Sequence, residues 1–358
     1  MIDGKTSPMI AACVACALPL ALSAGALAQT MPETTIRVIG GYSTQIQTSR
    51  VEKPFWTEEI PRDSGGKIKV TYSPHDLMGI KEQQIIRLSE AGVADIATTD
   101  ILKLGGDDPV FEGCDLPGTS PDMETTRKAC ATWSPIMADT MAKKFRTRLL
   151  ALAPNPGLVF FCRTEMNSLK DLAGRKVRVN SRPLADFVTA FGATALTTPF
   201  GEVVPGLQRG VFDCAISGSL SGNTAGWGEV TKFIYPLAVT WALTYHSASV
   251  DSWDKWAPSV RDYLTAKFKS FEDRLWTMGS QMEQEGIACS AGKDPCTLGR
   301  KNAMTITPVD PGDRELVKKV TQEAVLLQWA KRCGKECAAR WNDTFGKAVG
   351  LSIPLDRI

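Results

Sequence analysis

The sequence predicts an α/β protein of two lobes, each built as a β-sheet flanked by helices. The chain has 358 residues, 43% of them hydrophobic, which suffices for two domains of ordinary size. A β-α-β-α-β pattern fills residues 176–216. The motif G-V-x-D-x-A occurs at residues 92–97 and again at 210–215, each time after an amphipathic helix and entering a strand. This internal echo indicates two similar halves.

Residues 169–217 form the segment around which the rest of the chain is organised. Alternation of charged and β-branched residues, or short apolar runs bounded by turn residues, predicts its strands. Ser181 and Pro183 supply a helix N-cap and a first-turn proline between two of them. Crossover helices between the strands favour a parallel sheet. The strands are expected at 176–179, 195–198 and 211–216.

Arg178 is out of place in this segment, because it lies between Val177 and Val179 in a strand that should be buried on both faces. A buried guanidinium is costly unless it is paired. One interpretation is a strand-end arginine that reaches solvent or an internal carboxylate. The other is a site for a ligand carboxylate, which matches the planar and always charged donor pair of arginine.

Four pieces of the sequence resemble the extracytoplasmic solute receptors of tripartite ATP-independent periplasmic (TRAP) transporters. They are LKDLAGRKVRV from residue 169, PFGEV from 199, LQRGVFDCA from 207 and EVTKF from 229. Their order and spacing match the family, and the resemblance covers nearly all of the chain after residue 28. It implies a two-lobed fold like that of type II periplasmic binding proteins, with a long helix near residues 253–286 that spans both lobes.

The resemblance also implies a function. In that family the arginine of the K-x-R-V strand, here Arg178, clamps the carboxylate of an organic acid. The aromatic residue of the PFGEV piece, here Phe200, packs on the ligand; a hydrophobic staple for the following helix is its alternative role. The closed receptor docks on permease subunits. The expected partners are therefore a small organic acid anion and a TRAP permease, with no cofactor.

The domain boundaries expected from this family follow the crossings of the chain between lobes. The first crossing is placed at the Pro154–Gly157 break, and a strand at 235–246 is expected to cross back after a helix at 227–234. The expected divisions are a signal peptide at 1–28, lobe I at 29–152, lobe II at 153–240, and the crossing strand, spanning helix and C-terminal helices at 241–358.

The first 28 residues have the pattern of a cleavable export signal. Lys5 gives a weakly basic start, residues 9–22 are apolar and rich in alanine, and Ala26–Ala28 is an A-x-A cleavage pattern before Gln29. A buried N-terminal helix is the alternative interpretation. No later apolar run reaches membrane-spanning length. The sequence therefore predicts a mature protein that begins near Gln29, in the periplasm.

The cysteines fit an oxidising compartment. Ten are present and two lie in the predicted signal, which leaves an even number of eight. A metal site is disfavoured, because the chain has two histidines, and the part after the predicted signal has no H-x-x-x-H or paired C-x-x-C pattern. The predicted disulfides are Cys289–Cys296 across a Gly/Pro loop, Cys333–Cys337 if the helix breaks at Gly334, and, by proximity alone, Cys114–Cys130 and Cys162–Cys214.

Residues just beyond the predicted strands are further candidates for ligand binding, because ligands of open α/β sheets bind at the C-terminal strand ends. Glycine permits close backbone approach there, tyrosine offers a ring with a polar tip, and Ser or Thr hydroxyls can donate to ligand oxygens. A plain turn is the alternative for the glycine loop, and a helix N-cap is the alternative for Asp100. The candidates are Gly41, Tyr42, Thr99, Asp100, Ser217 and Ser219.

Trp241, on the strand expected to cross back, completes the candidate ligand-binding residues. The related receptors often carry Asn-His near Ala238 and Asn at the position of Ser217, and this chain has neither. Loss of these amide donors, with Trp241 and Tyr42 retained, predicts a flatter and less polar ligand, an aromatic carboxylate.

Other classes of function are disfavoured by what the sequence lacks. A net charge of +2 without a basic cluster gives no sign of a nucleic-acid partner. There is no G-x-S-x-G, no Ser/His/Asp set in a plausible context and no metal motif, so the protein is not expected to be an enzyme. A sensory protein that presents its ligand to a receptor kinase is an alternative. A periplasmic enzyme that uses carboxylates as acid and base is the weaker one.

Overall fold

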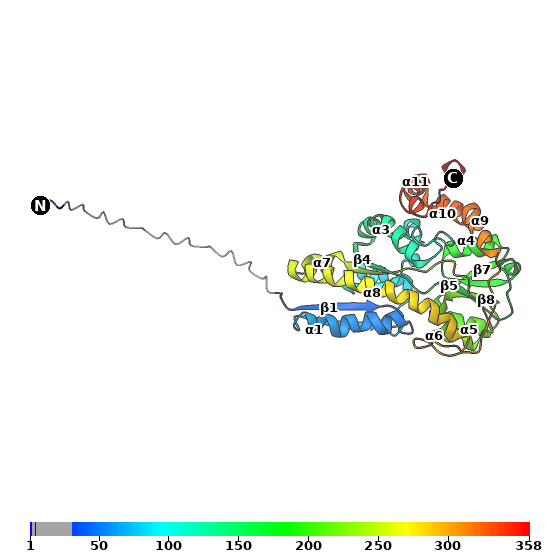
Figure 1. Ribbon diagram of the computed structural model, residues 1–358, viewed down its shortest axis with the longest axis horizontal. Helices are drawn as coiled ribbons and strands as arrows, with labels where there is room; N and C mark the ends of the chain where they lie inside the picture. The colour runs from blue at the N-terminus through cyan, green and yellow to red at the C-terminus, as the bar shows by residue number, and fades with distance from the viewer. Residues whose placement is uncertain (2–3, 5–30) are drawn as a thin grey trace. The chain divides into compact units, whose positions relative to one another are not determined.

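The structure, a computed structural model, describes residues 1, 4 and 31–358. The export signal predicted over residues 1–28 lies outside the described residues, apart from Met1 and Gly4. Residues 31–358 form two β-sheets with helices on their faces (Figure 1). Within this described part, every helix is too short or too polar to cross a lipid bilayer.

The first sheet, which defines lobe I, contains β1 (Thr34–Gly40), β2 (Ile68–Pro74), β3 (Ile96–Asp100), β4 (Thr147–Ala153) and β10 (Thr244–Ser249). Their order is β2-β1-β3-β10-β4. Strand β1 is parallel to β2 and β3, whereas β10 is antiparallel to both of its neighbours. In β1, Ile36 and Val38 are buried while Arg37 is exposed, which is the alternation expected of a strand with one face in the core.

The second sheet defines lobe II. It contains β5 (Leu158–Cys162), β6 (Lys176–Val179), β7 (Thr194–Thr197), β8 (Cys214–Gly218), β9 (Phe233–Tyr235) and β11 (Thr305–Ile306). Their order is β11-β9-β5-β8-β6-β7, with β6 parallel to β7 and β8. The β-α-β-α-β prediction for residues 176–216 is therefore confirmed. The hydroxyl of Ser181 caps the intervening helix by accepting from the Leu184 N–H at 3.4 Å.

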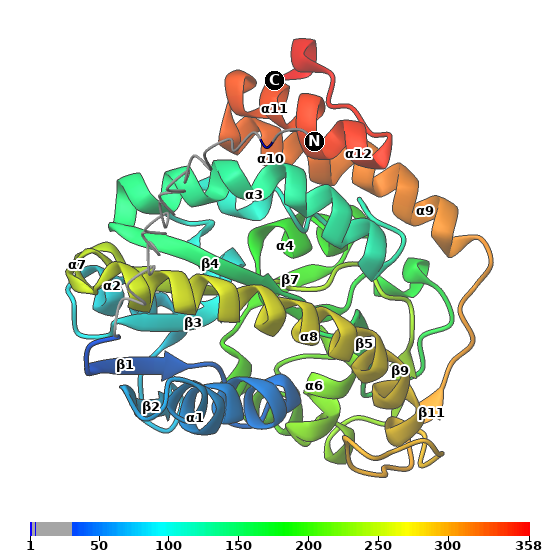
Figure 2. The same ribbon diagram turned by 60° about the vertical axis from the view of Figure 1, so that its left-hand side comes forward.

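Helices cover the sheets and extend beyond them (Figure 2). A helical stretch begins at Thr48 and ends in α1, and a second stretch joins α9 to α10. The helices are α1 (Ile60–Asp63), α2 (Glu82–Glu90), α3 (Met123–Phe145), α4 (Arg182–Ala190), α5 (Val203–Gln208), α6 (Ser219–Thr224), α7 (Val250–Lys255), α8 (Pro258–Ser290), α9 (Asp313–Val320), α10 (Leu326–Cys333), α11 (Lys335–Trp341) and α12 (Lys347–Val349).

Helix α8 lies along both lobes, as the resemblance predicted (Figure 1). Its Trp276 donates an indole N–H to the carbonyl of Leu152 in β4 at 2.8 Å. Near its other end, the carbonyl of Glu283 accepts from the Ser219 hydroxyl at 3.1 Å, and Ser219 opens α6 of lobe II. One continuous helix of 33 residues is thus anchored to both lobes.

Two local predictions around the second crossing are wrong. In place of a helix at 227–234, a single helical turn at Trp227–Glu229 is followed by strand β9. The strand predicted at 235–246 is mostly an irregular crossing segment, and β10 begins only at Thr244. Tertiary contacts decide this conformation, because the buried carboxylate of Asp115 accepts from the backbone N–H groups of Trp241 and Ala242.

The structure contains all four predicted disulfides, Cys114–Cys130, Cys162–Cys214, Cys289–Cys296 and Cys333–Cys337. Cys162–Cys214 joins the adjacent strands β5 and β8. In lobe I, Phe55 packs between α8 and β-sheet residues, with its ring centroid 4.4 Å from that of Phe271. Disulfides and core packing therefore hold the strands of the two lobes, and with them the strand ends, in place.

Candidate ligand-binding site

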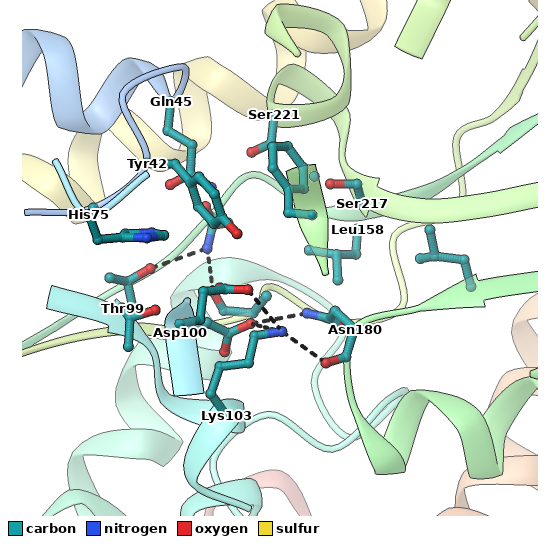
Figure 3. A pocket seen from close by; sticks show the side chains of 18 of the residues that line it. Tyr42, Gln45, His75, Thr99, Asp100, Lys103, Leu158, Asn180, Ser217 and Ser221 are labelled. Atoms are coloured by element: carbon teal, nitrogen blue, oxygen red, sulfur yellow. Dashed lines mark hydrogen bonds and ion pairs between the residues drawn. The ribbon is translucent and has the colours of Figure 1, made fainter. Parts of the chain in front are cut away.

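A cavity lies where the C-terminal ends of strands from the two sheets meet (Figure 3). Strands β1 and β3 approach it from lobe I, and β6 and β8 approach it from lobe II. Its volume is about 50 Å³, where one water molecule needs roughly 10–15 Å³. The cavity is lined by Gly41, Tyr42, Gln45, His75, Glu82, Thr99, Asp100, Lys103, Asn155, Leu158, Arg178, Asn180, Phe200, Ile216, Ser217, Gly218, Ser221, Ala242 and Thr244.

Arg178 is the buried cation of this wall, with 2% of its surface exposed. Its Nε and Nη2 donate to the carbonyl oxygen of Thr198 at 2.9 and 2.8 Å, and its Nη1 donates to the carbonyl oxygen of Ile216 at 2.9 Å. A guanidinium has five N–H groups, so one remains on each terminal nitrogen. The two carbonyls hold the plane of the guanidinium, and two of its N–H groups remain for another acceptor.

The electrostatic surroundings of Arg178 fit neither solvent exposure nor an internal ion pair. Burial lowers the pKa of Arg178 to about 10, although the negative charges of Glu82 and Asp100 act in the opposite direction. Among residues 31–358, no carboxylate forms a hydrogen bond with the guanidinium. The ring of Trp227 lies 5.6 Å from the guanidinium carbon. The cation is thus desolvated, and no carboxylate of the described residues lies within ion-pair distance of it.

Aromatic rings from both lobes meet beside this cation. Tyr42, in the loop after β1, has its ring centroid 4.3 Å from that of His75 and 5.2 Å from that of Phe200. Phe200 is in turn 5.5 Å from Trp227. Burial, reinforced by a neighbouring carboxylate, raises the pKa of the Tyr42 hydroxyl above its ordinary value. The Tyr42–Phe200 contact therefore joins lobe I to lobe II over the cavity.

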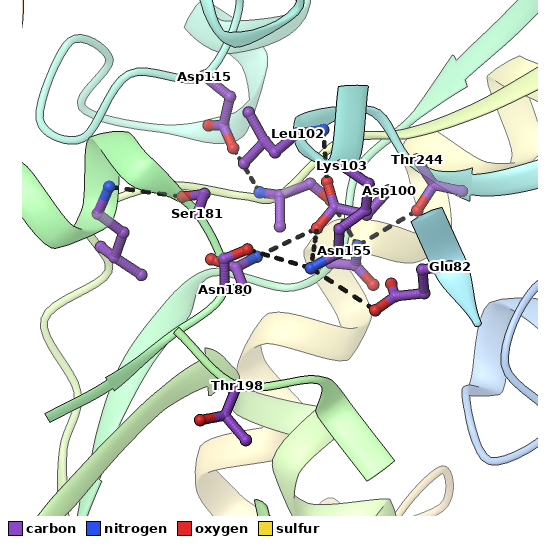
Figure 4. Close-up of polar contacts among 12 residues, drawn as sticks. Glu82, Asp100, Leu102, Lys103, Asp115, Asn155, Asn180, Ser181, Thr198 and Thr244 are labelled. Carbon is purple, nitrogen blue, oxygen red and sulfur yellow. Dashed lines mark hydrogen bonds and ion pairs between the residues drawn. The ribbon is translucent and has the colours of Figure 1, made fainter. Parts of the chain in front are cut away.

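A polar cluster forms another part of the wall (Figure 4). Lys103 Nζ lies 3.6 Å from Glu82 Oε2 and 3.9 Å from Asp100 Oδ2, and it donates to the carbonyl oxygen of Asn180 at 3.1 Å. Asp100 also accepts from the Leu102 N–H at 2.9 Å and from the Asn180 amide at 3.1 Å. Burial raises the pKa of Asp100 to about 6. Asp100 thus caps a helical turn and also lines the cavity.

Asn155 connects the two crossing segments next to the cavity. Its amide donates to the carbonyl oxygen of Ala242, and its Oδ1 accepts from Gln47 Nε2 at 2.6 Å. Ala242 adopts a left-handed conformation with φ 48°, which costs energy for a residue with a Cβ. The Asp115 carboxylate holds it there by accepting the Ala242 N–H. The backbone beside the cavity is therefore fixed by polar side chains from lobe I and from the crossing itself.

A buried carboxyl group lies directly behind the glycine loop. Glu52 Oε2 accepts from the Gly41 N–H at 3.0 Å. A Cβ at position 41 would lie 2.9 Å from Thr48 Oγ1 and 3.2 Å from Glu52 Oε2, so glycine allows this close approach. Burial raises the pKa of Glu52 to about 7, and burial lowers the pKa of the adjacent His246 to about 3. His246 Nδ1 is 2.9 Å from Thr98 Oγ1.

The comparisons with known proteins place the chain in a family. The model of the bacterial extracellular solute-binding proteins of family 7 matches residues 42–331. The protein belongs to this family. The resemblance to the solute receptors of TRAP transporters is thereby confirmed, and so is the two-lobed fold.

Individual relatives of this family 7 protein are distant. The ectoine-binding periplasmic protein TeaA of Halomonas elongata is 26% identical over 187 residues, which are 48% of this chain and 55% of TeaA. The chain thus matches about half the length of that relative. DctP7 of Bordetella pertussis, a receptor that binds pyroglutamic acid, has a TM-score of 0.78 and 18% identity, over 87% of this chain and 99% of DctP7. A TRAP solute-binding protein of Desulfovibrio salexigens with bound orotic acid has a TM-score of 0.77 and 17% identity, over 88% of this chain and 99% of that protein.

Seven of the nine candidate residues from the sequence line the cavity of this family 7 protein. They are Gly41, Tyr42, Thr99, Asp100, Arg178, Phe200 and Ser217. The structure places the other two elsewhere. Trp241 is 2% exposed, lies on the crossing segment and directs its indole N–H toward Glu283 of α8, at 3.5 Å. Ser219 is fully buried and donates to the carbonyl oxygen of Glu283, so both contact the spanning helix instead.

Several wall residues were missed by the sequence analysis, above all Glu82, Lys103, Asn155 and Asn180. Asn180 directly follows the strand that carries Arg178, and that position alone was a usable signal. Lys103 lies in a short helical turn whose burial no local pattern indicates. Residues 31–358 contain no grouping of three His, Cys, Asp or Glu side chains that could hold a metal ion.

Proposed function

We propose that the protein is a periplasmic solute receptor that binds a small organic acid in the cavity between its lobes and delivers it to a TRAP-type permease. The observation that carries the proposal is the state of Arg178. This guanidinium is buried and lacks a carboxylate partner within the described residues, and one N–H remains on each terminal nitrogen. A carboxylate fits such a pair of donors with both of its oxygens.

Closure of the lobes supplies the mechanism. Residues of lobe I and lobe II both line the cavity, so a ligand there contacts both lobes and favours the closed state over the open one by its differential binding energy. The Tyr42–Phe200 contact joins the two lobes and so belongs to the closed arrangement. A carboxylate that enters replaces a desolvated, unpaired cation by a charge-assisted pair, so closure and ligand binding reinforce one another.

The structure supports a different class of ligand from the aromatic carboxylate expected from the sequence. One reason for that expectation was Trp241, which lies outside the cavity. The other was a lack of amides, yet Gln45, Asn155 and Asn180 all line the wall. The small volume and the polar wall support a compact, polar organic acid, and the aromatic contacts left are those with Tyr42 and Phe200.

The proposal is tested by binding and recovery of the ligand. The purified protein is denatured, and the released small molecules are identified by mass spectrometry; a carboxylic acid is expected at up to one equivalent. Isothermal titration of the stripped protein with that acid should give a single site, and the acid should be recovered unchanged. Failure of every carboxylate to bind would overturn the proposal, and a chemically altered ligand would favour the enzyme alternative.

Delivery to a permease is tested separately from binding. Deletion of the gene in its natural host should abolish uptake of the radiolabelled acid, and a plasmid copy should restore it. A host that still takes up the acid but loses a transcriptional response to it would favour the sensory alternative.

A further inference from the structure

The cavity wall holds hydrogen-bonding atoms that lack partners among the described residues. Asn180 Oδ1 and the hydroxyl of Thr99 are buried groups of this kind, and Glu82 Oε2 also lacks a hydrogen bond, although it faces the ammonium of Lys103 at 3.6 Å. Glu82 is 7% exposed and Thr99 is 3% exposed, and all three residues line the cavity with Arg178. Leaving a buried polar atom unpaired costs roughly 1–3 kcal/mol. A ligand that donates hydrogen bonds here relieves that cost.

The lysine of the cluster does not offer a second carboxylate site. Its ammonium already faces two carboxylates, at 3.6 Å in Glu82 and 3.9 Å in Asp100, and it donates to the carbonyl oxygen of Asn180. A second ligand carboxylate next to Lys103 would therefore lie beside two like charges. Like charges placed together in a desolvated site are strongly disfavoured.

The charges of the cavity wall also disfavour a second carboxylate on the ligand. Arg178 and Lys103 carry two positive charges, and Glu82 and Asp100 balance them when both are ionised. A monocarboxylate adds one negative charge, which Arg178 meets directly. A dicarboxylate adds a second one on the side of Glu82, where acceptors already outnumber donors. An N–H or O–H at that end of the ligand would give Glu82 Oε2 and Asn180 Oδ1 the hydrogen bonds that they lack.

We propose that Glu82 selects monocarboxylic acids that carry an N–H or O–H donor at the end remote from the carboxylate, and that it rejects dicarboxylates of the same length. The proposal rests on the proposed function, because it assumes that Arg178 holds the carboxylate. Asn180 Oδ1 and the Thr99 hydroxyl assist by accepting from the same part of the ligand. Glu82, at the first turn of α2, is thus a specificity-determining residue of the site.

A series of four-carbon acids that differ only at one end tests this selection. Butyrate, 4-hydroxybutyrate, 4-aminobutyrate and succinate are titrated into the stripped wild-type protein by calorimetry, and pyroglutamate is compared with cyclopentanecarboxylate as a cyclic pair. A hydrogen bond to a charged group is worth roughly 1.5–3 kcal/mol, so the donor-bearing acids should bind about 10- to 150-fold more tightly than their donor-free partners. Succinate should bind more weakly than 4-hydroxybutyrate.

Two variants test whether the side chain of Glu82 causes this selection. Glu82→Gln should reduce the preference for donor-bearing acids at least tenfold and should improve succinate binding. Glu90→Gln, at the far end of the same helix and outside the cavity, should leave every ratio unchanged. The ratios measured on the wild-type protein test the selection itself even if Glu82→Gln does not fold.

The outcomes separate this proposal from the proposed function. If the acids bind and Arg178→Lys weakens them all, but succinate binds best or donor-free acids bind equally well, Glu82 does not select and the receptor function stands. If folded Glu82→Gln ranks the acids by affinity as the wild type does, Glu82 does not select and the receptor function again stands. If none of the six acids binds, the selection proposed for Glu82 fails, and the receptor function fails with it only if the co-purified acid also shows no binding.

Discussion

Replacement of Arg178 by lysine and by methionine separates charge from fork geometry. In the structure the carbonyls of Thr198 and Ile216 use three of the five N–H groups, so one donor remains on each terminal nitrogen. Lysine keeps the charge and loses the planar pair, a loss of about 1.5–3 kcal/mol, or about 10- to 150-fold in Kd. Methionine leaves the ligand carboxylate buried without a partner, which costs about 3–5 kcal/mol, or about 150- to 5,000-fold.

The stability of the ligand-free protein should change far less than the affinity. Burial lowers the pKa of Arg178 from 12.5 to about 10, which corresponds to about 3 kcal/mol of cost for holding the cation there. Arg178→Met removes that cost, but it leaves the carbonyls of Thr198 and Ile216 without a donor, at about 1–3 kcal/mol each. These effects oppose one another, so the melting temperature without ligand should move by only a few degrees.

The assay is isothermal titration with the identified acid, together with thermal unfolding without it. Arg274→Lys is the matched control, since Arg274 pairs with Glu59 at 2.7 Å on the exposed side of α8 and its replacement should change Kd less than twofold. The reasoning is refuted if both Arg178 variants bind within threefold of the wild type. It is also refuted if affinity falls only in proportion to a general loss of folded protein.

Three further outcomes are expected. Burial raises the pKa of Glu52 from 4.5 to about 7, so the folded state binds that proton more tightly, and the contribution of Glu52 to the free energy of unfolding should fall by at most about 3 kcal/mol as the pH rises from about 4.5 to about 7. Burial of the adjacent His246 lowers its pKa to about 3 and acts in the opposite direction over part of that range, so the wild type is compared with Glu52→Gln: the difference between their urea-unfolding free energies should decrease as the pH rises, and a pH-independent difference would count against this account. Joint Cys162→Ala and Cys214→Ala replacement opens a loop with a sequence separation of 52 and should lower unfolding free energy by about 4 kcal/mol; an unshifted urea midpoint would contradict this. Phe200→Ala removes an aromatic contact across the cavity, worth about 0.5–1.5 kcal/mol, so stopped-flow should show ligand release about 2- to 13-fold faster, and an unchanged release rate would exclude that role.

The parts of the site that the sequence predicted are those fixed by local pattern. Arg178 stood out because it interrupts a β-branched strand, and that strand forms as expected. Gly41 and Tyr42 follow a strand whose alternation is plain, and a strand end is where α/β sheets bind ligands. These inferences needed only the residue, its neighbours and the direction of the strand.

The rest depended on contacts between distant segments. Glu82 and Lys103 come together only when α2 packs beside the turn that follows β3, and neither has a local signal for burial. Trp241 was placed in the site on the assumption of a regular strand. Asp115, more than a hundred residues earlier, instead accepts two backbone N–H groups of the crossing segment, and the indole contacts Glu283 of α8.

The central claim is that the two remaining N–H groups of Arg178 bind a ligand carboxylate, and a crystal structure of the protein with its co-purified acid tests it most directly. We expect one carboxylate oxygen on Nη1 and the other on Nη2, each at about 2.7–2.9 Å, with Thr198 and Ile216 still accepting from the same guanidinium. An acid bound in the cavity with its carboxylate on Lys103 or in solvent, and with Arg178 untouched, would contradict the account.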